Sequence, residues 1–266
     1  MARFDPDSYE RYRVHYPPEL FEPLRPLVGS GFSSGWSVAD LGAGTGISSS
    51  SFLRFAPWVT ALYWVDPDPS MLARGEISDE FSRVRLEKVC APAESFDVPC
   101  RVDGVLIGSA WHWMNSSAVL DGLTQRLKPG GWLAIFEYQF PKAYGAGSAH
   151  GINEWVRRQF NQVWKPLGQT PRGSFDELLE PARTHRDFSF RAKNSVTRVW
   201  DLDVEAFEGV IVSQSRYLAH EALLPPEERA LARNALRAAL QDFWGNQGGI
   251  SFEYRFEIRI FQTRFV

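Results

Sequence analysis

The sequence has few cysteines and no surplus of positive charge. Among its 266 residues only Cys90 and Cys100 could pair, and no Cys/His group has the spacing of a metal site. The 29 Lys and Arg residues are outnumbered by 32 Asp and Glu residues, which gives a formal net charge of −3. Because basic side chains supply much of the affinity for phosphate backbones, we do not expect nucleic acid to be a partner.

Long apolar runs are also absent. No stretch has the unbroken length of a membrane span, and the opening residues lack the apolar core of a signal peptide. These absences predict a cytoplasmic protein without a membrane partner. The length fits a single α/β domain over residues 1–266 with an added segment, and the composition indicates no oligomeric state.

What the sequence does contain is a glycine-rich turn between an apolar run and a helix-like segment. Trp36–Leu41 predicts a buried strand and Ile47–Phe55 the start of a helix, and residues 42–46 between them carry three alternate glycines. Glycine permits positive φ and lets a ligand approach the backbone, while the helix amino terminus offers free N–H groups. A dinucleotide site needs glycine one residue later, where this chain has Ile47, so the spacing argues against NAD.

Acidic residues accompany the first two predicted strands. Asp40 lies near the end of the first strand, and Asp66 follows the run Val59–Val65, twenty residues after Gly46. In nucleotide-binding α/β units an acid at this second position accepts hydrogen bonds from ribose hydroxyls. The alternative is that Asp66 caps the following helix, which Asp68 could also do.

Strand and helix patterns continue to alternate as far as residue 138. Arg83–Cys90, Val102–Gly108 and Leu133–Glu137 predict strands, the last of them after a helix stop and turn at Leu127–Trp132. Residues 250–260 alternate apolar and polar side chains, as expected of a half-covered strand.

Residues 139–224 interrupt this alternation, and we interpret them as a substrate-selecting insertion. Within it Phe188–Phe190 and Val196–Trp200 predict short strands, and Val204–Tyr217 predicts a helix.

Asp40 with its alternate glycines, Asp66 and the Leu127–Trp132 turn together resemble the motifs of the class I S-adenosylmethionine-dependent methyltransferases. The resemblance covers residues 36–138, and the pattern is most similar to the methyltransferase type 11 or trans-aconitate methyltransferase-like branch. It implies a Rossmann-like α/β fold, with a seven-stranded, mostly parallel sheet, helices on both faces and an antiparallel C-terminal strand pair. It also implies a lid over residues 1–20 and assigns substrate capping to the 139–224 insertion.

The resemblance further implies S-adenosyl-L-methionine as the cofactor and S-adenosyl-L-homocysteine as its product. A sulfonium methyl group is already electrophilic, so the protein must chiefly align the acceptor and exclude water. The positions expected at the cofactor are Tyr9, Arg13, Asp40, Gly42, Ala43, Gly44, Gly46, Asp66, Pro67, Met71, Ala93, Glu94, Gly108 and Ser109.

The amino-terminal segment predicts a lid helix. Tyr9, Tyr12, Arg13 and Tyr16 have helical spacing and are expected on one face. Arg13 can hold the methionine carboxylate of the cofactor or an acid on the substrate. The alternative is an exposed amphipathic helix that binds no ligand.

His112 is the predicted catalytic residue. It follows the fourth strand, at the edge where open α/β sheets bind ligands, and a histidine suits the role of general base for a hydroxyl or an amine. A carboxylate acceptor needs no base, and His112 would then orient the substrate or pack between its tryptophan neighbours. The residues expected at the substrate are Tyr16, Trp111, Trp113, Arg216 and Tyr217.

These observations predict methyl transfer to an oxygen or nitrogen atom, including a carboxylate oxygen, of a small organic metabolite. Two alternatives remain. One is a regulatory or binding module that holds the cofactor without transferring methyl; the other is an enzyme of the same fold that catalyses a rearrangement or cyclisation. All three need the same cofactor residues, so those residues do not separate them.

Overall fold

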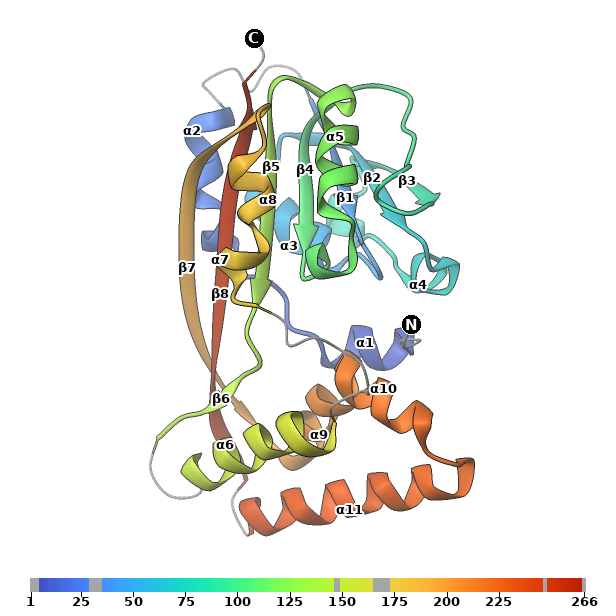
Figure 1. The fold of residues 1–266 in the computed structure, drawn as a ribbon, viewed down its shortest axis with the longest axis vertical. Helices are drawn as coiled ribbons and strands as arrows, with labels where there is room; N and C mark the ends of the chain where they lie inside the picture. Colours follow the sequence, from blue (N-terminus) through green and yellow to red (C-terminus); the bar gives the residue numbers. More distant parts are fainter. Residues whose placement is uncertain (1–4, 29–34, 146–148, 165–172, 246–247, 265–266) are drawn as a thin grey trace. The chain divides into compact units, whose positions relative to one another are not determined.

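A mixed sheet with parallel strands at its centre organises the chain (Figure 1). The computed structural model describes residues 5–28, 35–145, 149–164, 173–245 and 248–264. The strand order is β3-β2-β1-β4-β5-β8-β6, and β7 also pairs with β8. The strands are β1 (Trp36–Leu41), β2 (Val59–Asp66), β3 (Arg85–Cys90), β4 (Val102–Gly108), β5 (Leu127–Tyr138), β6 (Lys142–Ala143), β7 (Phe188–Leu202) and β8 (Ile250–Thr263).

The chain divides into two compact units, which we call the sheet unit and the helical unit. The sheet unit consists of residues 14–138, 173–196 and 256–266. The helical unit consists of residues 1–13, 139–172 and 197–255.

In the sheet unit the order in which strands are added to the sheet reverses at β1. From β1 it proceeds through β2 to β3 on one side and then returns to β4 on the other, and all of these neighbours pair in parallel. Such a reversal opens a crevice at the carboxyl end of the central strand, where open α/β sheets bind ligands. The glycine turn at residues 42–46 lies directly after β1, so it is placed at this crevice.

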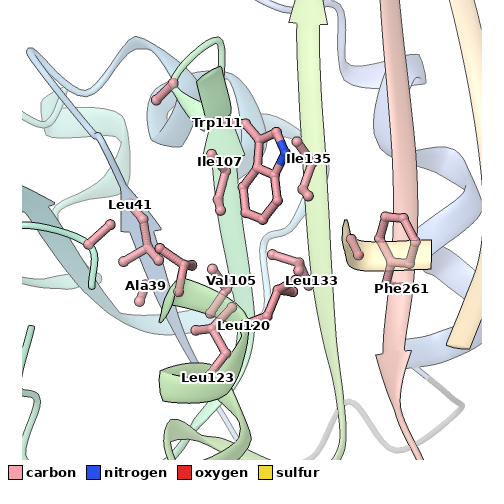
Figure 2. Packing of buried hydrophobic residues seen from close by; sticks show 14 of the residues in the cluster. Ala39, Leu41, Val105, Ile107, Trp111, Leu120, Leu123, Leu133, Ile135 and Phe261 are labelled. Atoms are coloured by element: carbon pink, nitrogen blue, oxygen red, sulfur yellow. The ribbon is translucent and has the colours of Figure 1, made fainter. Parts of the chain in front are cut away.

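Helices cover both faces of the central parallel strands, and β1 and β4 are therefore mostly apolar on both sides, whereas the outer strand β3 is largely exposed. On one face Leu120 and Leu123 of α5 (Ser116–Arg126) pack with Val105 and Leu133, as Figure 2 shows. On the other face Phe52 packs against Phe21 and Trp132. The helical segments of this unit are η1 (Pro18–Leu24), α2 (Arg25–Val28), α3 (Ile47–Phe55), α4 (Pro69–Arg74), η2 (Asp79–Phe81), η3 (Trp111–Trp113), α5, α7 (Phe175–Leu178) and α8 (Glu180–Thr184).

The helical unit has an aromatic core of its own. Phe207 stacks on Phe252 with ring centroids 4.2 Å apart, and Trp244 packs against both rings. Tyr12 lies over Gly209, where a Cβ atom would come within 2.1 Å of the tyrosine ring. The helices are α1 (Pro6–Tyr12), α6 (Ala149–Arg158) with a π-helical turn η4 (Gln159–Val163), α9 (Val204–Val212), α10 (Ser215–Leu223) and α11 (Pro226–Trp244).

The predicted fold class is confirmed, with one strand more than expected, because the two-residue β6 pairs with the start of β8. The two short strands predicted at 188–190 and 196–200 are parts of one strand, β7. The helix predicted over Val204–Tyr217 is two helices, because Gln214 has extended backbone angles of φ −79° and ψ 138°.

The prediction that one helical face carries Tyr9, Tyr12, Arg13 and Tyr16 was wrong. Helix α1 ends at Tyr12, and Arg13 is already extended, with φ −84° and ψ 141°. Tyr16 precedes Pro17, and a residue before proline is biased away from the helical region. The remaining domain predictions, a single domain with a lid over 1–20 and an insertion over 139–224, stay predictions.

None of the helices in the described part of the chain combines the length and apolar character that a membrane span requires.

Candidate active site

The carboxylate of Asp40 is fully buried at the end of β1. Its Oδ2 atom accepts hydrogen bonds from the hydroxyl groups of Ser48 and Ser49, which lie in the first turn of α3, each at 2.5 Å. Its Oδ1 atom has no hydrogen-bond partner among the described residues. Burial raises the pKa of Asp40 to about 6, although the two serine hydroxyls act in the opposite direction. The site therefore holds a carboxylate that is incompletely paired and is costly to ionise.

The three glycines of the turn all have positive φ, but their surroundings differ. A Cβ atom on Gly42 would lie 2.5 Å from the Cβ of Ala110, and one on Gly46 would lie 2.2 Å from the ring of Trp64. At Gly44 a Cβ atom would meet only the terminal methyl of Met71, at 3.2 Å. The turn is thus closed by protein at its two ends and bounded only by a flexible side chain at its middle.

Asp66, at the end of β2, fixes the middle of the turn. Its Oδ2 accepts a hydrogen bond from the Gly44 N–H at 2.9 Å, and its Oδ1 accepts one from the Asp68 N–H at 2.8 Å. Burial raises the pKa of Asp66 above its ordinary value, while these two N–H groups lower it. Asp68 itself caps α4, so the capping role considered for Asp66 belongs to Asp68.

Most of the other positions expected at the cofactor belong to the sheet unit. Ala43 is buried, and its N–H donates to the Val65 carbonyl at 3.2 Å. Ala93 is buried, and the Glu94 carboxylate accepts a hydrogen bond from the Asn115 N–H at 2.7 Å. Pro67 follows Asp66 directly, before α4, which contains Met71.

Ser109, the first residue after β4, has an unusual backbone conformation. Its φ is +52°, and among the described non-glycine residues it alone has positive φ. Its N–H donates to the Phe136 carbonyl at 2.7 Å, and its hydroxyl lies 2.8 Å from the Tyr16 hydroxyl. Gly108 has no room for a side chain, because a Cβ atom there would lie 2.8 Å from the Cβ of Ser48. Strained residues of this kind concentrate at functional sites, and the structure brings together two residues that were predicted for different roles.

The three residues of η3 occupy different environments. Trp111 is 4% exposed and its indole N–H donates to the Leu178 carbonyl at 2.8 Å, so its ring lies in the core. Trp113 is 40% exposed, and its ring lies 5.0 Å from the His112 ring. Of the two tryptophans, Trp113 is therefore the one whose surface a ligand can reach.

Four predicted site residues belong to the helical unit. Arg13 donates from Nη2 to the Ser213 carbonyl at 2.6 Å and lies over the Tyr9 ring at 4.9 Å. Arg216 donates to the Phe160 carbonyl at 3.5 Å. Tyr217 is buried, and burial raises its pKa to about 12. Their predicted contacts with cofactor or substrate stay predictions.

Sequence reasoning missed the residues that support Asp40 and Tyr16. Besides Ser48 and Ser49, the indole N–H of Trp64 donates to the Ser49 hydroxyl at 2.8 Å, and the Ser51 hydroxyl accepts from the Tyr16 N–H at 2.9 Å. The signal that could have identified them is the run of serines at 48–51. Serine favours caps and turns over helix interiors, so a serine run in a helix predicted to pack on the sheet indicates polar partners inside.

In the ranges that the structure describes, no group of three or more His, Cys, Asp or Glu side chains is arranged to hold a metal ion.

Comparison with known proteins finds similar methyltransferases. Residues 39–135 match the family described as "Methyltransferase domain". Proteins from Mycobacterium bovis and Mycobacterium tuberculosis that are named uncharacterized methyltransferases are each 32% identical over 131 residues. The match covers 48% of this chain and 48% of those proteins, so the chain spans about half the length of the curated relatives it matches.

Solved structures share the fold over nearly the whole chain. A proposed type II methyltransferase from Anaeromyxobacter dehalogenans has a TM-score of 0.65 at 20% identity and covers 94% of this chain and 97% of its own. YjhP from Escherichia coli has a TM-score of 0.53 at 15% identity, with coverages of 97% and 98%. At these identities the likeness establishes the fold alone.

Replacing the buried acid should stabilise the protein at neutral pH. Unfolded Asp40 has an ordinary pKa of 3.8 and the folded value is about 6, so the folded state binds more protons between these values and loses stability as pH rises through them. The difference corresponds to roughly 3 kcal/mol above pH 6. Asp40→Asn should therefore raise the free energy of unfolding at pH 7.5 by up to this amount and flatten its dependence on pH between 4 and 6.

Denaturant unfolding at several pH values measures both effects. Asp97→Asn, at an exposed aspartate, is the control and should leave the profile unchanged. An Asp40→Asn protein that is less stable than the original at pH 7.5 would show that burial does not govern this carboxylate.

Proposed function

We propose that this chain, whose residues 39–135 match a methyltransferase domain, transfers the methyl group of S-adenosyl-L-methionine to an oxygen or nitrogen atom of a small organic metabolite. The observation that carries the proposal is the glycine turn, which is open only at Gly44. An N–H group held there by Asp66, beside an incompletely paired buried acid, is a place built for a polar ligand.

The unpaired atoms of the site match the cofactor's polar groups. Besides Asp40 Oδ1, the Thr45 hydroxyl is buried without a hydrogen-bond partner among the described residues. Buried polar groups in native structures are nearly always paired, so two such atoms, one near the end of β1 and one in the following turn, indicate that a ligand completes them. The cofactor offers an ammonium group, a carboxylate and ribose hydroxyls. We assign Asp40 to the ammonium end, directly or through water, and Asp66 to the ribose.

The sulfonium supplies an electrophilic methyl group, and the chain's own task is to place the acceptor. Tyr16, Ser109 and His112 lie at or just beyond the carboxyl end of β4 in the sheet unit, and the first two share a hydrogen bond of 2.8 Å. We assign the hydroxyl pair to holding the acceptor's oxygen or nitrogen and His112 to accepting its proton. The exposed face of Trp113 suits a flat or cationic acceptor.

A small acceptor, rather than nucleic acid, follows from the charge. With a net charge of −3 the chain has no surplus of the basic residues that phosphate backbones require. We extend the proposal to a cytoplasmic protein that needs no membrane partner.

Cofactor binding should depend on the opening at Gly44. Gly44→Ala places a methyl group where we propose that the ligand meets the backbone, so its affinity for S-adenosylhomocysteine should fall by about 100-fold or more. Alanine at this φ of +57° should also cost about 1–2 kcal/mol of stability. Calorimetry measures the affinity and thermal unfolding the stability.

Gly245→Ala is the matched control. Gly245 also has a positive φ of +51°, and with its ψ of −119° this is a conformation that essentially only glycine adopts. The space around it is open, so the variant bears backbone strain without a steric clash and lies far along the chain from the turn. It should bind S-adenosylhomocysteine normally. Equal affinities of Gly44→Ala and the unmodified protein would refute the proposed site.

Turnover should depend on His112. Mass spectrometry of small acids, phenols and amines incubated with protein and S-adenosylmethionine should reveal a product heavier by one CH₂ group. With that acceptor, His112→Ala should lower kcat by about 10²–10⁴-fold if the histidine is the base, with cofactor affinity unchanged. A rise confined to KM would make His112 a residue that orients substrate.

Binding of the cofactor without any methylated product would favour the regulatory module or the rearrangement enzyme. More efficient methylation of tRNA or of a folded protein would overturn the assignment of a small acceptor.

A further inference from the structure

We propose that the ion pair between Arg259 and Asp176 positions the glycine turn of the candidate cofactor site, acting through helix α7 and the side chain of Trp111. The inference rests on the proposed function, because it assigns a role toward cofactor binding to residues that do not touch the cofactor. All the contacts involved lie within the sheet unit.

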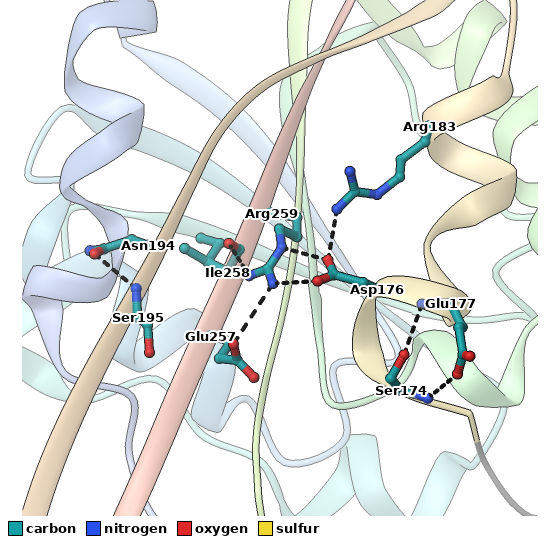
Figure 3. A network of polar contacts seen from close by, with 9 residues as sticks. All are labelled: Ser174, Asp176, Glu177, Arg183, Asn194, Ser195, Glu257, Ile258 and Arg259. Atoms are coloured by element: carbon teal, nitrogen blue, oxygen red, sulfur yellow. Dashed lines mark hydrogen bonds and ion pairs between the residues drawn. The ribbon is translucent and has the colours of Figure 1, made fainter.

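The first link joins the antiparallel edge of the sheet to α7, as Figure 3 shows. The guanidinium of Arg259, on β8, donates to both carboxylate oxygens of Asp176, from Nε at 3.0 Å and from Nη2 at 3.3 Å. The same guanidinium lies 5.2 Å from the centre of the Phe175 ring, and Asp176 also accepts from Arg183 at 2.7 Å. A two-pronged contact fixes orientation as well as distance, so the start of α7 is tied to β8.

This pair is asymmetric in its burial. The Arg259 side chain is 6% exposed, whereas that of Asp176 is 57% exposed. The arginine charge depends on its partners, which also include Glu257 at 3.7 Å. The buried Arg259 thus holds α7 against the sheet. Its guanidinium also keeps the pKa of the Asp176 carboxyl below its ordinary value.

The second link joins the end of α7 to the turn after β4. The carbonyl of Leu178 accepts the hydrogen bond from the Trp111 indole N–H at 2.8 Å. In Figure 2 the Trp111 ring lies between Ile107 of β4 and Ile135 of β5. Since this core is closely packed, the ring has one position, which α7 and the two strands define together.

The third link reaches the glycine turn. Trp111 is the first residue of η3, and its neighbours Ala110 and Met114 both face Gly42. A Cβ atom on Gly42 would lie 2.5 Å from the Ala110 Cβ and 3.2 Å from the Met114 methyl. Ala110 and Met114 therefore occupy the space beside the Gly42 backbone that a side chain would otherwise fill. We infer that a shift of η3 displaces the turn that carries Gly44.

The test measures affinity for S-adenosylhomocysteine by calorimetry in three single variants, Trp111→Phe, Asp176→Asn and Arg259→Lys. Each keeps the size and shape of the side chain close to the original but removes one link. We expect each to raise the dissociation constant by about 3- to 30-fold. The double variant Trp111→Phe with Asp176→Asn should lose less than the product of the two single losses, because both changes break one chain of contacts.

Two matched controls lie in the same unit. Trp132→Phe removes a buried indole whose N–H has no hydrogen-bond partner among the described residues. Asp103→Asn removes a carboxylate that pairs with Lys128 and with the Ser37 N–H near the amino end of β4, opposite the site. Both controls should reduce thermal stability without changing the affinity for S-adenosylhomocysteine.

A second measurement does not depend on binding. In protein with ¹⁵N-labelled tryptophan, Asp176→Asn and Arg259→Lys should shift the indole signal of Trp111, identified by its loss in Trp111→Phe, and leave that of Trp132 in place. Shifted Trp111 signals with weakened binding support the proposal.

Unchanged affinity in all three variants, an unmoved Trp111 signal, or equal effects in the controls would overturn it. An unmodified protein that does not bind S-adenosylhomocysteine would instead refute the proposed function, and the indole signals would still report whether Asp176 and Arg259 hold Trp111.

Discussion

The burial of the Asp40 carboxylate is the constraint on which the rest of the site depends. A carboxylate removed from water must find hydrogen-bond donors within the protein, and here these are hydroxyl groups in the first turn of α3. The donors fix where α3 begins relative to β1. One of them, Ser49, accepts from the indole of Trp64, whose ring closes the turn at Gly46. One buried acid thereby relates a strand, a turn, a helix and the neighbouring strand β2 through a single polar network.

This arrangement lowers the stability of the folded protein and leaves a site that is prepared to bind a ligand. The network satisfies one carboxylate oxygen and leaves the other unpaired among the described residues, while Ser109 has a backbone conformation that is costly for a residue with a side chain. Both costs lie at the carboxyl edge of the parallel strands. Strain concentrated at one place on a rigid sheet is what a preorganised ligand site requires, because the protein need not rearrange when the ligand arrives.

Local pattern was enough to predict the strands, the glycine turn and the acids beside it, because each depends on residues close together in the sequence. The errors arose where distant residues decide. Helix α1 ends at Tyr12 although helical spacing continues to Tyr16, and the extended Arg13 donates to the distant Ser213 carbonyl. Strand β7 continues through a polar stretch because pairing with β8 supplies its hydrogen bonds. The bonds from Arg13 to Ser213 and from Arg259 to Asp176 join residues 200 and 83 positions apart, and no spacing rule anticipates them.

The amino-terminal segment shows how such distant contacts redefine a predicted element. Tyr12 packs on Gly209, and Arg13 donates to the carbonyl of Ser213 at the end of α9, so α1 is anchored within the helical unit. Three residues later Tyr16 is anchored within the sheet unit, by its N–H to Ser51 and its hydroxyl to Ser109. The extended link between them therefore connects two separate anchor points instead of continuing one helical face. The predicted role of Arg13 thus depends on the helical unit that positions it, whereas that of Tyr16 depends on the sheet.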